Sequence, residues 1–352
     1  MKTVELFDLE VLQFKSLSHL NKYLTCYGVF CPIVEGWNAG GKTTTLSALT
    51  HLLLGGIDVN GNRTNSIEPI TATLHLYVDG ESWFIQNTQS KTWIWKSANQ
   101  EYNAYKKGLE EVLGIKKQHL RLLCLPDYFI NLSGAAQREE FIALLENSPF
   151  VLKNLDKKFD IATILKEHGS IINYKKTLKD RLKVIEANFG FLTMLESYSV
   201  NINYSFELKH TARDVARQIR EIEQEHWEKA KINVINELNT VISIENALIA
   251  LFNKEVEKMR EISCLGWLVH IVQDEKTGQE SLKITHNGVE YKNLNQAKKM
   301  QIACQFSVLF QNLMEINLPL FIDNFERIDE GNAELIEDIT KDRQVFVTRV
   351  TY

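Results

Sequence analysis

The sequence predicts an α/β fold that two distant segments of the chain build together, with a helical hairpin inserted between them. Three observations predict this arrangement. A glycine-rich phosphate-binding pattern, Gly36–Thr43, lies near the start, between a strand-like run and a helix-like run. Near the end, an apolar run that reads as a buried strand stops at a carboxylate, Leu318–Asp323. No proline occurs between positions 149 and 319, so long helices are free to form there.

The composition is that of an ordinary globular protein: of 352 residues, 44% are hydrophobic and 24% are charged. The formal net charge of −5 gives no general attraction to nucleic acid, so a DNA contact requires a local basic patch. No run of about 18 apolar residues predicts a transmembrane helix, and the acidic start does not resemble a signal peptide. None of the five cysteines forms a C-x-x-C pair. We therefore expect no membrane association and a reducing, cytoplasmic location.

Gly36–Thr43 reads GWNAGGKT and fits G-x-x-x-x-G-K-[ST], the P-loop pattern. Its glycines let backbone N–H groups turn toward a phosphate without an obstructing Cβ. In this pattern Lys42 reaches the β- and γ-phosphates and Thr43 holds Mg²⁺, while the helix expected at Thr44–Leu54 directs its N-terminal dipole at the phosphates. The alternative is a glycine-rich turn that binds nothing. The residues predicted to bind ATP are Gly36, Asn38, Ala39, Gly40, Gly41, Lys42, Thr43 and Thr44.

A P-loop needs a carboxylate that holds Mg²⁺, and such a carboxylate commonly ends a buried strand. Asp323, which follows the apolar run Leu318–Ile322, fits this position and is predicted as the second metal residue beside Thr43. The alternative is an N-cap aspartate after a core strand. Because Asp323 lies so far along the chain from Lys42, both flanks must build one domain around the segment between them.

The intervening segment has heptad-like apolar spacing in two runs, which predicts a helical hairpin over about 155–262. Ser197–Tyr204, between the runs, favours helix poorly and marks the turn. The alternative is a compact helical subdomain without a coiled coil. We therefore expect 1–150 and 263–352 to form the two parts of the head, and 151–262 to form the insertion. The two runs are Leu178, Leu182, Ile185, Phe189 and Leu192, and Leu208, Ala212, Val215, Ile219 and Ile222.

Both flanks carry further strand and turn signals. Asp79-Gly80 and Asn287-Gly288 are strong turn pairs, each between two strand-like runs, and they predict two β-hairpins. The strands expected are 3–14, 28–35, 71–78, 83–86, 267–272, 282–286, 289–291, 318–322 and 345–350, and a helix is expected over 295–314.

Several motifs resemble those of the SMC/Rad50/RecF/RecN group of ATP-binding-cassette (ABC) ATPases. Val11–Ser16 is similar to the group's early L-x-N-F-K-S strand, with Gln13 in place of the usual Asn. Gly36–Thr43 is similar to G-x-N-G-x-G-K-[ST], with Ala39 in place of the middle glycine, and Leu52–Asp58 resembles L-L-F-G-x-D. The resemblance covers both flanks, half of the chain. It implies an α/β P-loop NTPase with an ABC-type head built from N- and C-terminal segments, around an inserted helical hairpin or short antiparallel coiled coil.

The motifs are most similar to those of small bacteriophage-type Rad50-like ATPases. This similarity implies a DNA-associated ATPase of recombination, repair or replication, located in the host cytoplasm if the protein is phage-encoded. The motifs that carry it are Asp58–Arg63 with Ile67–Pro69, Pro126–Phe129 with Gln137-Arg138, Tyr291–Ala297, and Pro319–Glu326.

The resemblance also implies roles for individual residues. In this group two heads enclose two ATP molecules, and a signature loop of one head caps the γ-phosphate held by the other. Leu294–Ala297 stands at the signature position, which implies that Asn295 binds ATP in trans; the alternative is a plain Asn N-cap. The group's catalytic base directly follows the metal aspartate, where this chain has Asn324. The implied catalytic residues are Lys42, Glu326 as the base or else as a solvated carboxylate, and Asn324 as a residue that orients the attacking water.

The implied function is a Mg²⁺-dependent ATPase whose ATP-driven homodimerisation gates DNA or a separate partner nuclease. Asp329 resembles the aspartate that helps pair two heads, and Thr348 stands at the position of the group's switch histidine. Two alternatives stay open: an ATP-locked clamp with negligible turnover, and a defence-system ATPase of the same fold. Lysine doublets would hold DNA by backbone charge, and otherwise they are solvated faces. The doublets are Lys106-Lys107, Lys116-Lys117, Lys157-Lys158, Lys175-Lys176 and Lys298-Lys299.

Overall fold

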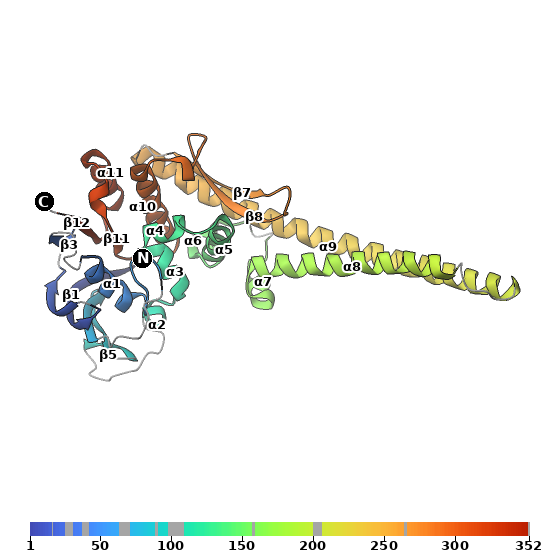
Figure 1. Ribbon diagram of the computed structural model, residues 1–352, viewed down its shortest axis with the longest axis horizontal. Helices are drawn as coiled ribbons and strands as arrows, with labels where there is room; N and C mark the ends of the chain where they lie inside the picture. Colours follow the sequence, from blue (N-terminus) through green and yellow to red (C-terminus); the bar gives the residue numbers. More distant parts are fainter. Residues whose placement is uncertain are drawn as a thin grey trace. The chain divides into compact units, whose positions relative to one another are not determined.

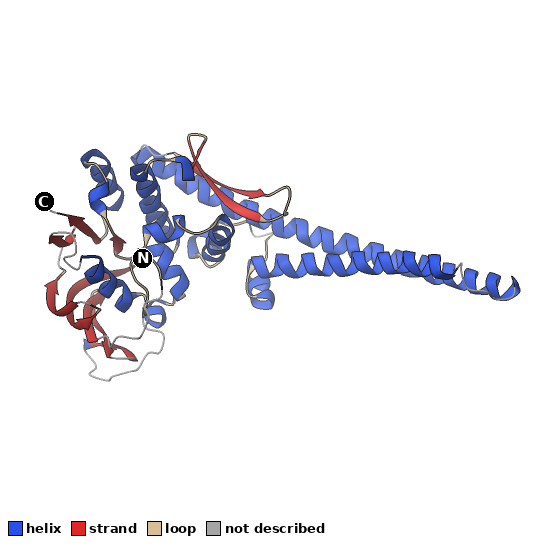
Figure 2. Ribbon diagram, viewed as in Figure 1, coloured by secondary structure: helices blue, strands red, loops and turns tan. Residues whose placement is uncertain are grey.

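A computed structural model describes residues 1–15, 17–24, 31–36, 42–62, 71–88, 91–97, 109–156, 159–199, 206–263 and 266–350. The chain forms two compact units, one made of Met1–Asn154 with Leu251–Tyr352 and the other of Leu155–Ala250. The first unit mixes strands and helices, and the second is helical (Figure 2). The expected segment boundaries at 150 and 262 differ from these limits, because one continuous helix, α9, is shared by both units.

Among the described residues, the first unit contains three sheets and the helices that cover them. Its strands are β1 (Lys2–Phe14), β2 (Leu17–Tyr23), β3 (Cys31–Gly36), β4 (Thr71–Val78), β5 (Glu81–Thr88), β6 (Lys91–Lys96), β7 (Trp267–Gln273), β8 (Glu280–His286), β9 (Val289–Glu290), β10 (Ile316–Asn317), β11 (Leu320–Ile322) and β12 (Val345–Val350). Its helices are α1 (Lys42–Leu53), α2 (Leu109–Leu113), α3 (Lys117–Cys124), α4 (Pro126–Ile130), α5 (Gly134–Leu145), α6 (Pro149–Asn154), α10 (Gln296–Leu313), α11 (Glu330–Thr340) and the 3-10 helices η2 (Tyr291–Asn293) and η3 (Phe325–Arg327).

The largest sheet has the strand order β10-β1-β4-β5-β6, with β2 also paired to β1. Figure 1 labels β1 and β5 of this sheet. In β4 every second residue is buried, and α1 packs against the sheet that contains Leu74 and Leu76. The turn from β4 to β5 has φ of 52° at Asp79 and 79° at Gly80, the left-handed geometry of a tight hairpin. The first predicted β-hairpin is therefore confirmed, although β5 extends beyond the expected 83–86 at both ends.

The second sheet is parallel and has the order β11-β12-β3. Strand β12 lies between the other two and pairs Val345 with Leu320 and Val350 with Gly36. Because all three strands run in one direction, their carboxyl ends lie at one edge, which is where open α/β sheets bind ligands. This edge joins the residue after β11 to the P-loop end of β3.

The third sheet, β7-β8-β9, is antiparallel. Its hairpin turns at Asn287 and Gly288, with φ of 49° and 80°, which confirms the second predicted hairpin. Tyr291, expected in the last strand, instead begins η2, so that part of the prediction is wrong. The Tyr291 hydroxyl donates to the Lys299 carbonyl at 3.1 Å, which ties η2 to the first turn of α10.

Gln344, just before β12, joins the large sheet to the parallel sheet. The Leu6 N–H of β1 donates to Gln344 Oε1 at 2.6 Å, and Gln344 Nε2 donates to the Leu6 carbonyl at 3.0 Å. The pairing of β1 with β4 shifts register directly after Leu6. The buried side-chain amide of Gln344 therefore provides the hydrogen-bond partners for the Leu6 N–H and C=O. The two halves of the chain are thereby hydrogen-bonded to each other close to the parallel sheet.

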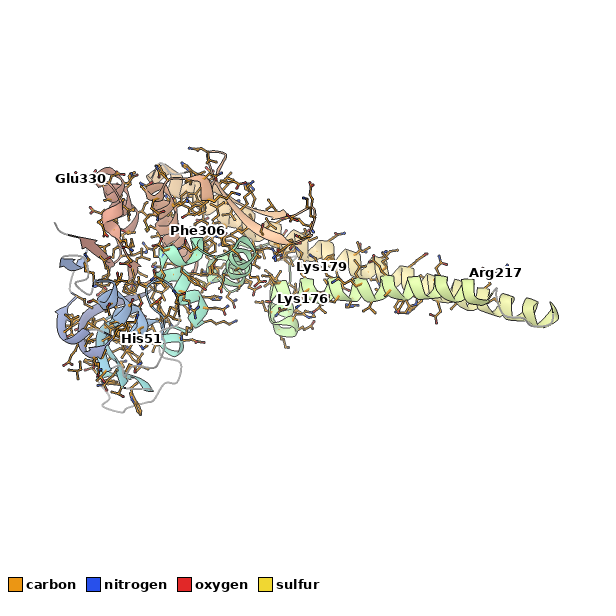
Figure 3. The ribbon with its side chains drawn as sticks, viewed as in Figure 1. His51, Lys176, Lys179, Arg217, Phe306 and Glu330 are labelled. Atoms are coloured by element: carbon orange, nitrogen blue, oxygen red, sulfur yellow. The ribbon has the colours of Figure 1, made fainter. Side chains whose placement is uncertain are left out.

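An aromatic core surrounds α10, which is buried from Met300 to Gln311. The ring centroid of Phe306 (labelled in Figure 3) lies 4.1 Å from that of Trp267 and 4.9 Å from that of Phe129. The ring centroid of Phe252, in the last part of α9, lies 5.5 Å from that of Phe310. Burying several aromatic rings in one cluster is a major source of stability. It fixes the helix that begins at the predicted signature loop.

The second unit contains α7 (Ile161–His168), α8 (Ile171–Ser199) and the first part of α9 (Phe206–Ser263), and Figure 1 shows α8 beside α9. Ion pairs connect the two antiparallel helices at successive levels: Lys175 Nζ lies 2.5 Å from Glu245 Oε2, and Lys231 Nζ lies 3.1 Å from Glu186 Oε1. The helical hairpin predicted from the sequence is therefore confirmed. The turn, within the predicted Ser197–Tyr204, lies largely outside the described residues.

The buried seam of α9 differs from the expected one. Val234, Val241 and Leu248 are buried, whereas Ile222, the last residue of the predicted second run, is 71% exposed. Ile222 precedes Val234 by three full turns plus about 120°, so the two cannot share one narrow seam on a regular helix. The prediction for Ile222 is therefore wrong.

Part of α9, within Glu221–Met259, is long and apolar enough to cross a membrane by length and composition alone, contrary to the sequence expectation. A third of its most apolar window is buried, and the same stretch contains Glu245, which is paired with Lys175 inside the hairpin. Length and composition are therefore weak evidence for a membrane span here.

Candidate nucleotide and metal site

Three chain segments meet at the carboxyl edge of the parallel sheet. Strand β3 ends at Gly36, and α1 begins at Lys42. Strand β11 ends at Ile322, so that Asp323 is the first residue beyond it, and β12 brings the Thr348 hydroxyl to 2.5 Å from Asp323 Oδ1. The predicted nucleotide-binding residues that lie outside the described residues are Asn38, Ala39, Gly40 and Gly41.

The two predicted metal residues are in direct contact. The Thr43 hydroxyl lies 3.1 Å from Asp323 Oδ1 and 3.1 Å from Oδ2, and it donates its proton to this carboxylate. Thr43 is in the first turn of α1, where Lys42 is 9% exposed and Thr44 is half-buried. The parallel sheet and α1 therefore place Thr43 and Asp323 as the P-loop pattern requires.

The donor set at this edge fits Mg²⁺. A hydroxyl and a carboxylate are hard oxygen ligands, and Mg²⁺ is bound in proteins by one or two carboxylates together with substrate phosphates rather than by an all-protein cage. Within the described ranges there is no group of three or more His, Cys, Asp or Glu residues that could hold a metal ion. Thr43 and Asp323 are thus the residues that would hold Mg²⁺ beside a bound phosphate.

Asn324 and Glu326 follow Asp323, the predicted metal ligand, but they differ in burial and backbone conformation. Asn324 has a left-handed backbone, with φ of 57° and ψ of 42°, and is half-buried. Glu326 lies in η3 and is exposed, and no described residue forms a side-chain hydrogen bond or ion pair with it. The structure therefore does not bring Glu326 into contact with Thr43 or Asp323.

The predicted signature loop leads directly into α10. Asn295 is the N-cap of this helix, and its Oδ1 accepts the Lys298 N–H at 2.9 Å. A polar chain continues from there: Lys298 Nζ donates to the buried Gln301 Oε1 at 3.2 Å, and Gln301 Nε2 donates to Asn332 Oδ1 at 2.5 Å. Asn332 in turn donates to Asp329, the N-cap of α11. A chain of hydrogen bonds therefore connects the first turn of α10, which follows the predicted signature loop, to Asp329 within one chain.

Two of the motifs that carry the family resemblance, Asp58–Arg63 and Pro126–Phe129, pack against each other at Gly61 and Tyr128. Asp58 Oδ1 accepts the backbone N–H groups of Asn60 and Asn62, which closes a tight turn. Gly61, in this turn, has φ of 78°, and a Cβ there would lie 2.3 Å from the Tyr128 ring. Glycine is required at this position both for the backbone conformation and for the close approach of Tyr128.

Asp127 is a carboxylate near the site that the sequence analysis did not assign. Burial and the negative charge of Asp323 raise the pKa of Asp127 to about 6. Burial and then the charge of Asp127 raise the pKa of Tyr291 above its ordinary value. Asp127 is in the first turn of α4, which packs against β11 and α10. The only sequence signal for it is the Pro-Asp pair within the family motif Pro126–Phe129.

The lysine doublets differ in what they can offer to DNA. Lys175 is 6% exposed at its side chain and forms a buried ion pair with Glu245, so it is excluded as a DNA contact. Its neighbour Lys176 is exposed on α8, as Figure 3 shows. Lys117 donates to the Gly55 carbonyl, and Lys299 lies 6.0 Å from the centre of the Tyr291 ring. The doublets at 106–107 and 157–158 lie outside the described residues.

No protein-family model matches the sequence, and a comparison with curated proteins finds no relative. Solved structures do match. The SMC head domain from Pyrococcus furiosus, with an extended coiled coil and bound to the C-terminal domain of ScpA, has a TM-score of 0.51 at 16% identity, over 100% of this chain and 90% of that one.

Two further solved structures have lower scores. RecF with ATP, the recombination mediator of the RecFOR pathway, has a TM-score of 0.49 at 14% identity, over 100% of this chain and 94% of that one. The SMC head domain with coiled coil and joint from Pyrococcus yayanosii has a TM-score of 0.44 at 13% identity, over 99% and 92%. From the Pyrococcus furiosus match and the strand order, the chain has the ABC-type P-loop fold of an SMC head domain with an inserted coiled coil, which confirms the predicted fold class.

Proposed function

We propose that this chain is a Mg²⁺-dependent ATPase head that binds ATP at the carboxyl edge of the parallel sheet. The observation that carries the proposal is the contact between Thr43 and Asp323, 3.1 Å apart at both carboxylate oxygens. In P-loop NTPases the threonine of the loop and an aspartate at the end of a neighbouring strand hold Mg²⁺ against the nucleotide phosphates, and this contact is the one that such a site requires.

The chemistry assigned to each residue follows from its position. The backbone N–H groups of Gly36–Thr43 and the N-terminus of α1 bind the phosphates, and Lys42 neutralises charge on the β- and γ-phosphates. Mg²⁺, when bound, neutralises charge that develops on the transferred phosphoryl group. Thr43 and Asp323 would orient that ion, Glu326 would deprotonate the attacking water, and Asn324 would orient that water.

A second copy of the chain completes the site in this proposal. The N-terminal turn of α10 contains no acidic residue and carries Lys298 and Lys299, which favours an anion in front of it. Asn295 caps that helix and would face the γ-phosphate held by the partner. The hydrogen-bonded chain from Lys298 through Gln301 to Asn332 supports this arrangement, because it aligns the first turn of α10 with Asp329.

The wider role proposed is in phage-type DNA recombination, repair or replication. Closure of two heads around ATP would gate DNA, or a separate nuclease subunit, and the hairpin would contribute exposed lysines such as Lys176 to the DNA backbone. The sequence motifs similar to those of small phage-type Rad50-like ATPases, among them Asp58–Arg63 and Pro126–Phe129, support this assignment.

A second candidate function is an ATP-locked clamp with negligible turnover. It is favoured by Asn324, whose side chain cannot accept a proton as a carboxylate does, and by the exposed position of Glu326. In that case ATP binding would close the dimer and slow hydrolysis would keep it closed.

Nucleotide binding tests the proposal directly. Calorimetric titration of the wild type with ATP and Mg²⁺ should give one site per chain, and Lys42→Ala should abolish it. Exposed Lys176→Ala serves as the matched control and should bind as the wild type does. Equal ATP affinity of the wild type and Lys42→Ala would overturn the assignment of the site.

A further inference from the structure

Thr348, in β12, occupies a position in the site that no P-loop motif assigns to a threonine. It is 2% exposed. Its Oγ1 lies 2.5 Å from Asp323 Oδ1 and 2.8 Å from the backbone nitrogen of Asn324. One buried hydroxyl therefore contacts both the predicted metal carboxylate and the residue after it.

The direction of both hydrogen bonds follows from the groups involved. A hydroxyl has one proton and two lone pairs, an ionised carboxylate only accepts, and a backbone N–H only donates. Thr348 must therefore donate its single proton to Asp323 and accept the Asn324 N–H. No proton is left for a phosphate or a water, so Thr348 is not a direct phosphate donor in this arrangement.

The backbone around Thr348 is irregular at the same point. The pairing of β12 with β3 shifts register between Val347 and Thr348, where Val347 faces Pro32 and Thr348 faces Val34. Such irregularities re-aim a side chain, and they are frequent beside active sites. Here the irregularity coincides with the residue that contacts Asp323.

The hydrogen bond from the Asn324 N–H to Thr348 stabilises a left-handed turn at Asn324. Asn324 has φ of 57°, which costs most non-glycine residues strain, and asparagine is one of the side chains that tolerate it. Its N–H is held by Thr348 in that conformation. The turn explains why asparagine, rather than a longer carboxylate side chain, suits this position.

We propose that Thr348 is a positioning residue of the nucleotide–metal site. Its hydroxyl fixes the Asp323 carboxylate against Thr43 and holds the backbone turn that sends the chain toward Glu326. This inference rests on the proposed nucleotide site and deepens it. Without the hydroxyl, the Asp323 carboxylate loses a charge-assisted hydrogen bond and is oriented less firmly toward the metal position.

The consequence is a specific loss of Mg²⁺-dependent affinity. Thr348→Val keeps the size and β-branching of the side chain and removes the hydroxyl, whereas Thr348→Ser keeps the hydroxyl. We expect Thr348→Val to weaken ATP binding about tenfold in saturating Mg²⁺, the usual scale of one hydrogen bond to a charged group, and Thr348→Ser to restore most of it. In EDTA, where Asp323 has no metal to hold, both variants should bind ATP as weakly as the wild type.

The experiment is a titration of a fluorescent ATP analogue into the wild type, Thr348→Val, Thr348→Ser and Thr348→Ala, with Mg²⁺ and with EDTA, together with thermal unfolding in each buffer. Thr348→Ala supplies a hydroxyl-free variant should valine not fold. Equal Mg²⁺-dependent affinity of wild type and the hydroxyl-free variants would overturn the inference, as would equal weakening in Mg²⁺ and in EDTA, or failure of serine to rescue. A wild type that binds no nucleotide would overturn the proposed function itself, and the Thr348 inference with it.

Discussion

The hydroxyl of Thr43 lies 3.1 Å from both carboxylate oxygens of Asp323, and 280 residues separate the two along the chain. The parallel pairing of β11, β12 and β3 accounts for this proximity, because it aligns the carboxyl ends of strands from both halves of the sequence. The site therefore depends on both flanks being present, with the helical hairpin as the connection between them.

Asp323→Asn should separate phosphate binding from metal binding. The amide keeps the shape of the side chain but loses the charge that attracts a divalent cation. We expect at least a tenfold loss of ATP affinity in Mg²⁺ and little change in EDTA, measured by calorimetry. The exposed carboxylate of Glu334 in α11 gives the control variant Glu334→Gln, which should behave as the wild type. An Asp323→Asn protein with full Mg²⁺-dependent affinity would show that the metal is held elsewhere.

The rate of phosphate release by Glu326→Gln should distinguish an active ATPase from an ATP-locked clamp. If Glu326 acts as the general base, removal of its carboxylate should slow steady-state phosphate release about 100-fold or more. Release at the same near-background rate by the wild type, Glu326→Gln and the Glu334→Gln control would establish the clamp instead. Unchanged, rapid release by Glu326→Gln would exclude Glu326 as the base.

Lys175→Met should destabilise the hairpin strongly. Lys175 and Glu245 are 6% and 2% exposed at their side chains, and removing one partner of such a buried ion pair costs about 3–5 kcal/mol. The double variant Lys175→Met/Glu245→Leu should recover most of that loss. Thermal unfolding followed by circular dichroism measures both effects.

The adjacent Lys176 is exposed, and Lys176→Met is therefore the matched control for Lys175→Met. Its unfolding temperature should stay close to that of the wild type, since exposed substitutions typically change stability by less than about 0.5 kcal/mol. Equal effects at the two positions would contradict the burial of the Lys175–Glu245 pair.

His51 should make stability depend on pH in the mildly acidic range. Burial, with the charges of Lys117 and Lys15, lowers the pKa of His51 to about 4 from its ordinary 6.5, and its Nε2 lies 3.1 Å from Asn87 Nδ2. The folded chain thus resists protonation that the unfolded chain accepts. The contribution is fully present above pH 6.5 and is lost as the pH falls toward 4, by about 3 kcal/mol at most.

His51→Gln should therefore flatten the pH dependence of thermal stability between pH 6.5 and 4. The slope should not vanish, because burial, with the charge of Lys116, also lowers the pKa of His119 to about 4. Unfolding temperatures of the wild type and His51→Gln at closely spaced pH values measure the difference. Identical slopes for the two proteins would contradict a neutral, buried His51.

Local signals in the sequence predicted the parts of the fold that local chemistry determines. The pairs Asp79-Gly80 and Asn287-Gly288 adopt the positive φ values that their hairpins need, and β12 has the predicted limits Val345–Val350. Strand β11 is shorter than expected, because the Gln311 side chain, rather than a strand, accepts the Leu318 N–H and donates to its carbonyl. The residues 318–322 alone could not predict this, because the hydrogen-bond partner of the Leu318 backbone is the side chain of Gln311 in another element.

The sequence was less informative where function depends on tertiary packing. The short helices α2, α3, α4 and α6 and the strand β6 were not predicted, since each is too brief to show a period of its own. The 12-residue α5 was not predicted either, because its buried face includes the polar Gln137 and Arg138 and is not an apolar stripe. The raised pKa of Asp127 and the hydrogen bond from Thr348 to Asp323 were not predicted either. Both arise from the proximity of these residues to Asp323 in the folded chain, which no local sequence pattern shows. Among the site residues, the sequence motifs gave Thr43 and Asp323 directly, and the structure joined them.

The molar mass of the chain with and without Mg-ATP tests the central claim most directly. Light scattering should give about 40.6 kDa, one chain, without nucleotide. With Mg-ATP, the Glu326→Gln variant should give twice that mass, and Lys42→Ala should stay at the mass of one chain. Monomers of the wild type and Glu326→Gln under saturating Mg-ATP would contradict a site that two copies complete.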